Sequence, residues 1–346
     1  MSDQKVSKIV APSPISAQTT AEQMRGGRAK SSRFDEGMHV IITGSGSALP
    51  DPQRGGCSTA VIIDGRILQF DCGRRFMDNM MQAGANPLDI DALCLTHLHF
   101  DHIALYSYYL IAAWVAGRQS MVHIIGPRGT KAMNAGALEM HDMDIRFVRS
   151  IVKYWPDATP VRPTAEPPFM VGDVTPGVVL DTDAYRVTAV ATDHLPDPEM
   201  KSLGYKVESR YGSVVISGDT RPVQGVIDLA RETDLLIHEC QKPDPGMIKG
   251  GKMQLKAFQK PDASRPQTGH TSPTELGMIA RSAQPKKVIA THLPPYTSVE
   301  PAVEMSKIYT GAAPGHQIWG DYIAAIKGHY NGPVILAEDA MVFDIG

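Results

Sequence analysis

The stretch from residue 90 to His102 constrains the fold of this chain more than any other part of the sequence. It begins as an apolar run, long enough for a buried strand, and then becomes polar within one residue. His97, His99, Asp101 and His102 fall within six positions. Imidazole and carboxylate groups at this density are suited to a divalent metal ion. On an extended backbone His97 and His99 would share a face, so a turn must bring Asp101 and His102 to the same place.

The same arrangement recurs at the ends of other apolar runs. Four later runs are followed by, or end in, a side chain of a metal-binding type: His194, Asp219, His238 and His292. In sheets layered with helices, functional residues gather at one set of strand ends. A single histidine after a strand is more often an ordinary loop residue, so the inference depends on the repetition. We therefore expect five strands to define one rim.

Apolar runs and turn signals predict strands that alternate with helices in two successive halves. Strands are predicted at residues 38–43, 58–63, 66–70, 90–95, 122–125, 185–191, 203–208, 213–217, 234–239 and 287–291. Helices are predicted at residues 74–83, 103–116, over most of 128–155, and at 226–230, 273–282, 301–310 and 321–329. Asp64-Gly65 predicts a two-residue hairpin turn, and 334–337 with 341–343 predict a terminal hairpin.

Three segments are predicted to lie outside these regular elements. Residues 1–36 are polar and are expected to form an extended arm, leaving 37–346 as the catalytic domain. Residues 156–176 contain six prolines and predict an irregular excursion between the halves. Residues 242–268 are rich in Lys, Pro, Gly and Gln and predict a mobile loop. The glycine turn after the first strand, residues 44–50, is expected to approach the metal site.

Composition limits the binding partners and the cellular compartment that we expect for this protein. With 346 residues and a net charge of -3, the chain has no global basic field to attract nucleic acid. No apolar stretch is long enough to span a membrane, and the first 35 residues lack a signal-peptide core. The four cysteines lack metal-site spacing and predict reduced, mostly buried thiols: Cys57, Cys72, Cys94 and Cys240. We expect a cytoplasmic protein.

Taken in order, the motif at 97–102, His194, Ser217-Gly-Asp219-Thr and Thr291-His292 resemble the metallo-β-lactamase superfamily. Within it, segments 217–222, 238–239 and 269–272 are most similar to the ribonuclease Z branch, which includes arylsulfatase-like and phosphodiesterase-like relatives. The resemblance covers about residues 38–345. It implies an α/β (α+β) fold, a four-layer αββα sandwich of two similar halves, and a homodimer.

The resemblance also implies a dinuclear metal site, with two zinc ions and with iron or manganese as alternatives. One metal would be held by His97, His99 and His194. The second would be held by Asp101, His102 and His292, with Asp219 bridging both. Such a pair lowers the pKa of a shared water, so that hydroxide can attack the substrate near neutral pH.

Four residues receive further roles from the resemblance. Asp101 would orient the nucleophile, in addition to binding metal. His270 matches a histidine that helps to protonate the leaving group in ribonuclease Z relatives, although a loop histidine beside a helix start is an equal alternative. His238 and Glu239 would support a ligand imidazole from behind rather than bind the metal.

The sequence is compatible with more than one hypothesis for the substrate. The main hypothesis is hydrolysis of a small ester-type, sulfate-ester, lactone or phosphodiester substrate. An alternative is tRNA 3′ processing, but no clear glycine- and basic-rich arm of the kind that grips tRNA in that branch is found in the 24 residues between His194 and Asp219 or in 156–176. A further alternative is a non-hydrolytic metal-binding or iron redox member of the fold. Aromatic residues after the metal motif could line a small-molecule pocket, although helical spacing places most of them in the core: Tyr106, Tyr108, Tyr109 and Trp114.

Overall fold

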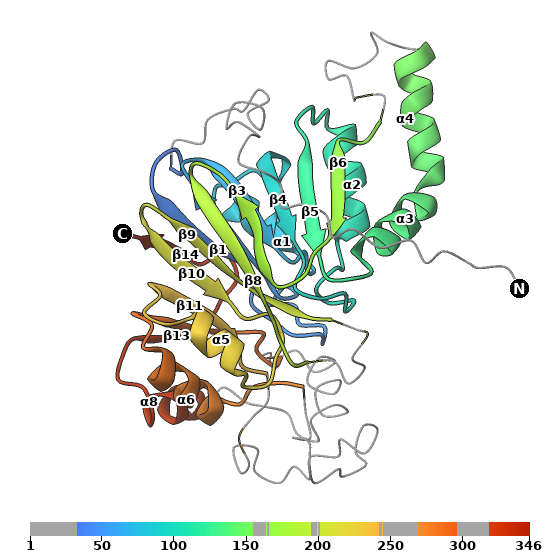
Figure 1. Cartoon of the computed structure of the whole chain (residues 1–346). Helices are drawn as coiled ribbons and strands as arrows, with labels where there is room; N and C mark the ends of the chain where they lie inside the picture. The colour runs from blue at the N-terminus through green and yellow to red at the C-terminus, as the bar shows by residue number, and fades with distance from the viewer. Residues whose placement is uncertain are drawn as a thin grey trace, which may run out of the picture.

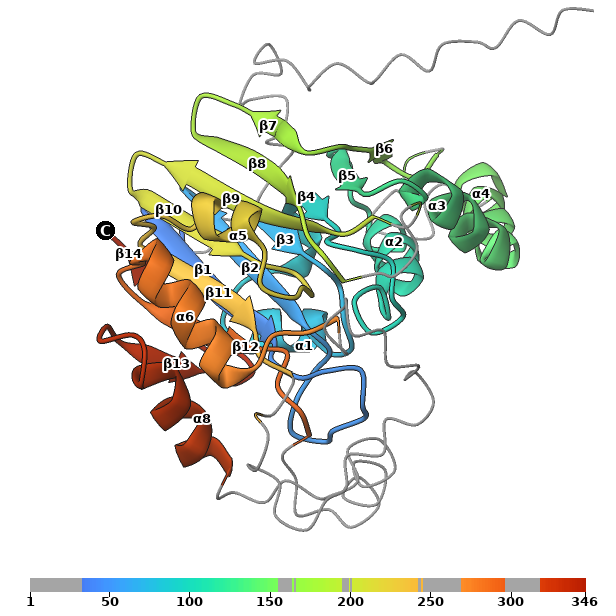
Figure 2. The same cartoon turned by 60° about the horizontal axis from the view of Figure 1, so that its bottom comes forward.

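Two seven-stranded sheets face each other, and helices cover the outer side of each sheet (Figures 1 and 2). The computed structural model describes residues 33–154, 164, 166–194, 199, 201–241, 244, 269–295 and 318–346. These layers are the predicted αββα sandwich of two similar halves. No helix in the described ranges is long and apolar enough to cross a membrane.

The first sheet has the strand order β14-β1-β2-β3-β4-β5-β6. Its strands are β1 (Met38–Gly44), β2 (Ser58–Ile63), β3 (Arg66–Phe70), β4 (Ile90–Cys94), β5 (Val122–Gly126), β6 (Phe169–Asp173) and β14 (Val342–Ile345). Its helices are α1 (Phe76–Gln82), the short 3-10 helix η1 (Pro87–Asp89), α2 (Tyr106–Val115), α3 (Thr130–Met140) and α4 (Asp142–Tyr154). From β3 to β6 the neighbouring strands run parallel.

The second sheet has the order β13-β12-β11-β10-β9-β8-β7. Its strands are β7 (Gly177–Asp181), β8 (Tyr185–Ala191), β9 (Leu203–Ser209), β10 (Gly212–Ile216), β11 (Leu235–Glu239), β12 (Val288–Thr291) and β13 (Val334–Leu336). Its helices are α5 (Gln224–Leu229), α6 (Pro273–Ala283) and α8 (Ile318–Lys327). Because β8 and β10 are both antiparallel to β9, and β10, β11 and β12 are parallel, these four strands end at the same edge.

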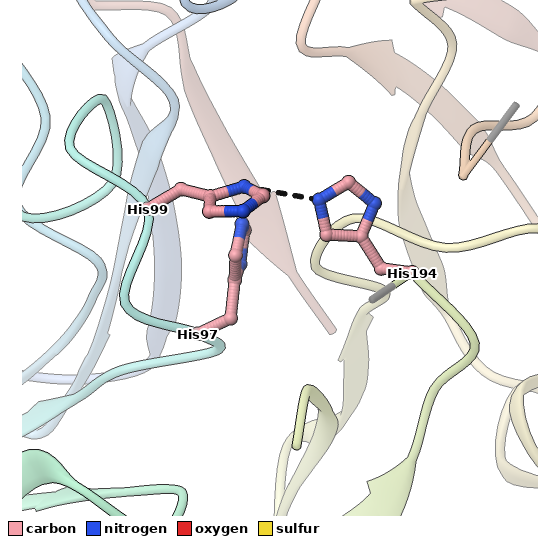
Figure 3. A group of neighbouring side chains, drawn as sticks. All are labelled: His97, His99 and His194. Atoms are coloured by element: carbon pink, nitrogen blue, oxygen red, sulfur yellow. Dashed lines mark hydrogen bonds between the residues drawn. The ribbon is translucent and has the colours of Figure 1, made fainter. Parts of the chain in front are cut away.

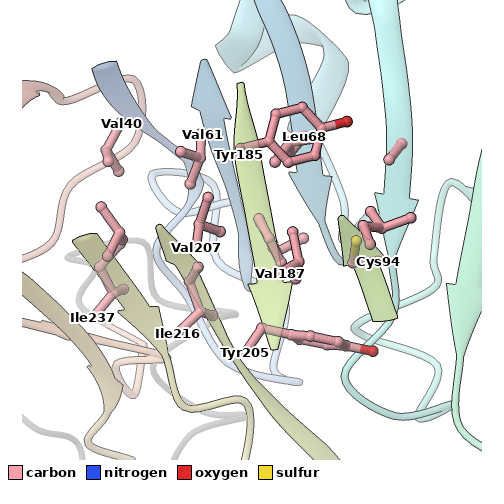
Figure 4. Packing of buried hydrophobic residues seen from close by; sticks show 14 of the residues in the cluster. Val40, Val61, Leu68, Cys94, Tyr185, Val187, Tyr205, Val207, Ile216 and Ile237 are labelled. Atoms are coloured by element: carbon pink, nitrogen blue, oxygen red, sulfur yellow. The ribbon is translucent and has the colours of Figure 1, made fainter. Parts of the chain in front are cut away.

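The central core lies between the two sheets (Figure 4). Alternate residues of a strand point to opposite faces, so each central strand feeds two apolar layers. In β2, Val61 and Ile63 face the other sheet, whereas Ala60 and Ile62 pack under the outer helices. Both faces are therefore buried, which explains why these strands are nearly continuous apolar runs in the sequence.

The prediction of a C-terminal hairpin is wrong. β13 pairs with β12 in the second sheet, whereas β14 pairs with β1 in the first sheet. The connection is held at Asp339, whose carboxylate accepts hydrogen bonds from Ser45 N, Gly55 N and Asn79 Nδ2. These bonds anchor the connection to the first half, so the chain crosses between the sheets instead of turning back on itself.

Several predicted boundaries also differ from the structure. The Pro-rich segment 156–176 contains β6, an edge strand paired with β5, so it is not irregular throughout. β7 was not among the predicted strands. Phe34, placed in the expected arm, is buried in the core beneath the helices of the first sheet, so the folded part begins at or before residue 34. Residues 1–32 of the expected arm, the predicted helix 301–310 and nearly all of loop 242–268 lie outside the described residues.

Other local predictions are confirmed. Asp64 and Gly65 have φ values of 48° and 77°, as a tight two-residue turn between β2 and β3 requires. All four cysteines are buried and free of disulfides.

Candidate metal centre

The predicted metal-binding residues come from strand ends that meet at one edge of the sandwich. The turn 97–102 follows β4, and His194 follows β8. Asp219 follows β10, and His292 follows β12. His292 has a φ of 54°, and the next residue, Leu293, is hydrogen-bonded on both sides to the loop after β1. That loop therefore approaches the site, as predicted.

The carboxylate of Asp219 lies at the centre of this group. Its Oδ1 is 3.3 Å from His102 Nε2, and its Oδ2 is 3.2 Å from His292 Nε2. Oδ2 is also 3.9 Å from His97 Nε2 and 3.8 Å from His194 Nε2. One carboxylate thus faces four imidazoles that come from three different segments.

Two groups of three side chains flank this carboxylate. The ligand atoms of His97, His99 and His194 all lie within 4.8 Å of one another (Figure 3). A second group with the same closeness consists of Asp101, His102 and His292. The structure therefore brings all seven predicted ligands together, in the two sets that the resemblance implies.

The donor set fits a pair of cations. His97 Nε2, His102 Nε2 and Asp219 Oδ1 are buried and form no hydrogen bond with any described residue. Such atoms are costly in a folded protein unless a partner satisfies them, and a metal ion is one such partner. Burial lowers the pKa of His97 well below its usual value, which favours the neutral imidazole that a metal needs.

The two carboxylates are held in their charged form. Burial alone would raise the pKa of Asp219, but His292 and His102 hold it well below the usual range. Burial likewise opposes ionisation of Asp101, yet His102 and His292 lower its pKa to about 2. Both groups are therefore carboxylates, the form that binds divalent cations, at neutral pH.

Asp71 belongs to the site but was not predicted. It follows β3 with a φ of 57°, and its Oδ2 accepts a hydrogen bond from His102 Nδ1 at 2.8 Å. Thr96 donates to the same carboxylate from its backbone N and from Oγ1. With Nδ1 bonded to Asp71, the Nε2 lone pair of His102 is free for a metal. An acidic residue directly after a buried strand was the available sequence signal.

We expect the Asp71→Asn variant to weaken metal binding or turnover by about 10- to 100-fold. Asparagine tolerates positive φ and can still accept the Thr96 backbone bond, so the protein should fold. It lacks the charge that raises the basicity of His102. Titration with a competing chelator would measure the loss. The matched control is Asp344→Asn, which weakens another Asp–His pair, the 2.7 Å contact to His39. Equal metal affinity in the two variants would contradict the role of Asp71.

Glu239 supports the residues beside the bridge position. Its Oε1 accepts hydrogen bonds from Thr220 N and Thr271 N and contacts His270 Nδ1 at 3.0 Å. His270 Nδ1 also lies 3.8 Å from Asp219 Oδ2. Burial would lower the pKa of His270, but Glu239 outweighs it and raises that pKa to about 9. Glu239 thus holds His270 in place, and it also holds the backbone of Thr220, the residue after Asp219.

His238 does not join the cluster. In β11 the side chain of Ile237 faces the other sheet, whereas Leu236 packs under the helices α6 and α8. Alternation places His238 on the same side as Leu236. Its Nδ1 is hydrogen-bonded to the carbonyl oxygen of Glu239. Of His238 and Glu239, only Glu239 therefore contacts residues of the metal centre.

The open side of the site is formed by half-buried histidines. His99 and His270 are partly exposed, whereas the side chain of His194 is 6% exposed and the other predicted ligands are buried. Phe100, next to His99, is 71% exposed. The aromatic residues of α2 are less available: Tyr106, Tyr109 and Trp114 are buried, and Tyr108 is exposed. The exposed edge of the site therefore lies at His99 and His270.

Comparisons with known proteins agree with this geometry. The sequence model of the metallo-beta-lactamase superfamily matches residues 53–292. A protein named ribonuclease Z from Mycobacterium sp. (strain KMS) is 37% identical over 209 residues, which is 60% of this chain and 70% of the relative. Ribonuclease Z of Mycobacterium bovis (strain BCG / Pasteur 1173P2) is 33% identical over 210 residues, 60% of this chain and 71% of that protein.

Solved structures show the same fold at low sequence identity. The short form of human tRNase Z superimposes with a TM-score of 0.60 at 20% identity, covering 89% of this chain and 99% of that chain. The metallo-beta-lactamase fold protein YhfI from Bacillus subtilis also gives a TM-score of 0.60, at 19% identity, covering 89% of this chain and 98% of that chain.

Proposed function

Because the chain belongs to the metallo-beta-lactamase superfamily, we propose that it hydrolyses phosphodiester bonds in small substrates with a pair of metal ions. It is a metal-dependent hydrolase of the ribonuclease Z branch. The observation that carries the proposal is the convergence of two ligand groups on Asp219. Zinc is the proposed metal, with iron or manganese as alternatives, since imidazole and carboxylate ligands accept all three.

Each ligand group would hold one cation. His97, His99 and His194 would bind the first, and Asp101, His102 and His292 the second. Asp219 would be shared by both. The cations would supply Lewis acidity and a hydroxide at neutral pH. Asp71, through His102, keeps one imidazole in the orientation and tautomer that this arrangement needs.

Two residues would handle protons and orientation. The carboxylate of Asp101 would accept a hydrogen bond from the attacking oxygen and so orient it. His270 lies on the open side with Nδ1 against Glu239, so its Nε2 is the nitrogen that would donate a proton to the leaving oxygen. Glu239 favours the protonated imidazole that this step requires.

The choice of a phosphodiester rests on the relatives, and the choice of a small substrate rests on this chain. Only 24 residues lie between His194 and Asp219, and β9 with β10 fills half of them. This interval has no room for a long RNA-gripping arm. The net charge of -3 gives no broad attraction to a polyanion. Small carboxylic esters, sulfate esters and lactones remain within the proposed substrate range.

Processing of tRNA 3′ ends is the second candidate, favoured by the 37% identity to a protein named ribonuclease Z. A non-hydrolytic metal-binding scaffold is not proposed, because all seven candidate ligands are present and converge. An iron redox role stays an alternative, since imidazole and carboxylate ligands also accept iron.

A turnover screen of the zinc-loaded protein tests these proposals. The substrates are bis-p-nitrophenyl phosphate, an aryl sulfate, a lactone and a precursor tRNA. We expect the highest kcat/KM for bis-p-nitrophenyl phosphate, and none after removal of metal by a chelator. Reloading with zinc, manganese or iron identifies the most active metal. Preferential trimming of the precursor tRNA would overturn the small substrate, and exclusive turnover of the sulfate or lactone would overturn the phosphodiester.

A further inference from the structure

The hydroxyl of Thr96 contacts two side chains that belong to different parts of the metal centre. Its Oγ1 lies 2.8 Å from Asp71 Oδ2 and 3.0 Å from His97 Nδ1. Asp71 Oδ2 also accepts a hydrogen bond from His102 Nδ1 at 2.8 Å. His97 belongs to the first ligand group and His102 to the second. Through this hydroxyl, a single carboxylate is therefore connected to a histidine of each group.

The hydrogen bonds of the Thr96 hydroxyl can run in one direction only. A carboxylate accepts hydrogen bonds and donates none, so the single proton of the hydroxyl points at Asp71. The hydroxyl oxygen is then the acceptor toward His97, and the proton between them belongs to His97 Nδ1. In the opposite order, the hydroxyl oxygen and the carboxylate oxygen would face each other at 2.8 Å without a proton between them.

This direction leaves a lone pair on His97 Nε2. A neutral imidazole carries one proton, so a proton on Nδ1 leaves Nε2 unprotonated. His97 Nε2 lies 3.9 Å from Asp219 Oδ2, is buried and forms no hydrogen bond with any described residue. His102 Nε2 is in the same situation, 3.3 Å from Asp219 Oδ1. Both rings thus turn Nε2 toward Asp219, because both Nδ1 protons are directed to Asp71, one of them through Thr96.

The surroundings of Thr96 hold its hydroxyl in this place. Its backbone N donates to Asp71 Oδ1 at 2.7 Å, and its carbonyl oxygen accepts from Leu203 N of β9 at 2.8 Å. A Cβ at Gly218 would lie 2.8 Å from Thr96 Cβ and 3.1 Å from Thr96 Cγ2, so Gly218 packs directly against this side chain. Thr96 is fully buried. A β-branched side chain packed in this way has little freedom to turn its hydroxyl elsewhere.

We propose that Thr96 is a positioning residue, whose hydroxyl relays the acceptor of Asp71 to His97 and so sets the tautomer of a ligand in the first group. Asp71 sets the tautomer of His102, in the second group, directly. The inference rests on the proposed metal centre but not on the proposed substrate. Serine at position 96 would keep the relay, whereas valine, which has the shape of threonine without the hydroxyl, would remove it.

The tautomer of His97 in the metal-free wild type tests the relay directly. In protein labelled with 15N-histidine, proton–nitrogen correlations within the ring distinguish a protonated from an unprotonated nitrogen. In mildly basic buffer, where an ordinary imidazole is neutral, we expect the proton of His97 on Nδ1. The signals of His97 are those that vanish in His97→Ala. A proton on Nε2 of His97 would overturn the proposal.

Metal affinity tests what the relay contributes to binding. Thr96→Val should weaken the binding of one metal by about 10- to 100-fold in competition with a chelator. Thr96→Ser should restore both the affinity and the proton on His97 Nδ1. The matched control is Thr130→Val, another fully buried threonine, whose hydroxyl donates to Pro127 O at 2.8 Å. That variant should bind metal as the wild type does.

The outcomes separate this inference from the proposed function. A wild type with two metals and a Thr96→Val variant of equal affinity would overturn the relay alone. A Thr96→Ser variant that binds no better than a folded Thr96→Val would also overturn it, because packing and not the hydroxyl would then be responsible. A wild type that binds no metal would overturn the proposed function, and the tautomer of its His97 would still confirm or overturn the relay. The same measurement decides if Thr96→Val does not fold by circular dichroism.

Discussion

The Asp219→Ala variant should retain fewer than two metals and should show no turnover above background. Asp219 lies within 4 Å of four of the other predicted ligands, with contacts of 3.2 to 3.9 Å. Its Oδ1 faces His102 and its Oδ2 faces histidines of both ligand groups, so the substitution removes a ligand from each proposed metal. It also places His102 and His292 beside a cavity instead of a carboxylate.

Metal analysis and kinetics on the same preparation check this expectation. The wild type should contain about two metals per chain. Asp219→Asn keeps the shape of the side chain but not the charge, so it separates ligand loss from misfolding. The matched control is Asp228→Ala, which removes an exposed aspartate bonded only to Gln224 and Arg231 among the described residues. Two metals and full turnover in Asp219→Ala would exclude Asp219 from the bridge.

The Gly56→Ala variant should unfold more easily and should lose the metal held by Asp101, His102 and His292. A Cβ at Gly56 would lie 2.7 Å from Asp101 O and 2.8 Å from Arg74 N. Contacts below 3.0 Å are essentially absent from folded proteins. Both neighbours are backbone atoms, so relief requires the turn 97–102 to move. Overpacking of this kind lowers the free energy of unfolding by about 1–3 kcal/mol.

Urea unfolding and metal stoichiometry measure the two parts of this prediction. Movement of Asp101 would separate it from His292, 3.3 Å away, so the stoichiometry should fall from about two toward one. Gly136→Ala is the matched control: it lies within α3, and no atom lies within 4 Å of its Cβ position. That substitution should stabilise the protein by about 0.5–1 kcal/mol. Wild-type stability and two metals in Gly56→Ala would contradict the argument.

The central strands could be predicted from the sequence because each is a short apolar run bounded by turn residues. The predicted helices that fall within the described residues were found with ends displaced by a few residues. The prediction of a terminal hairpin was wrong because the apolar pattern of residues 334–336 and 342–345 does not show which sheet each strand joins. Their separation depends on Asp339, which bonds to residues nearly 300 positions away. β6 was missed because the prolines before it concealed a short edge strand.

The sequence alone determined the chemistry of the site. Three histidines and an aspartate within six positions, followed by His194, Asp219 and His292 at strand ends, specify metal-binding groups whatever the details of the fold. Local patterns are sufficient here because the strand before each residue fixes where its side chain emerges.

Only the tertiary structure decided which residues support these groups. Asp71 reaches His102 across 31 positions, and Glu239 reaches His270 across the same number. His238, next to Glu239, is excluded because neighbouring residues of a strand face opposite sides of the sheet. Such roles depend on distances between segments that are remote in the chain, which no local pattern encodes.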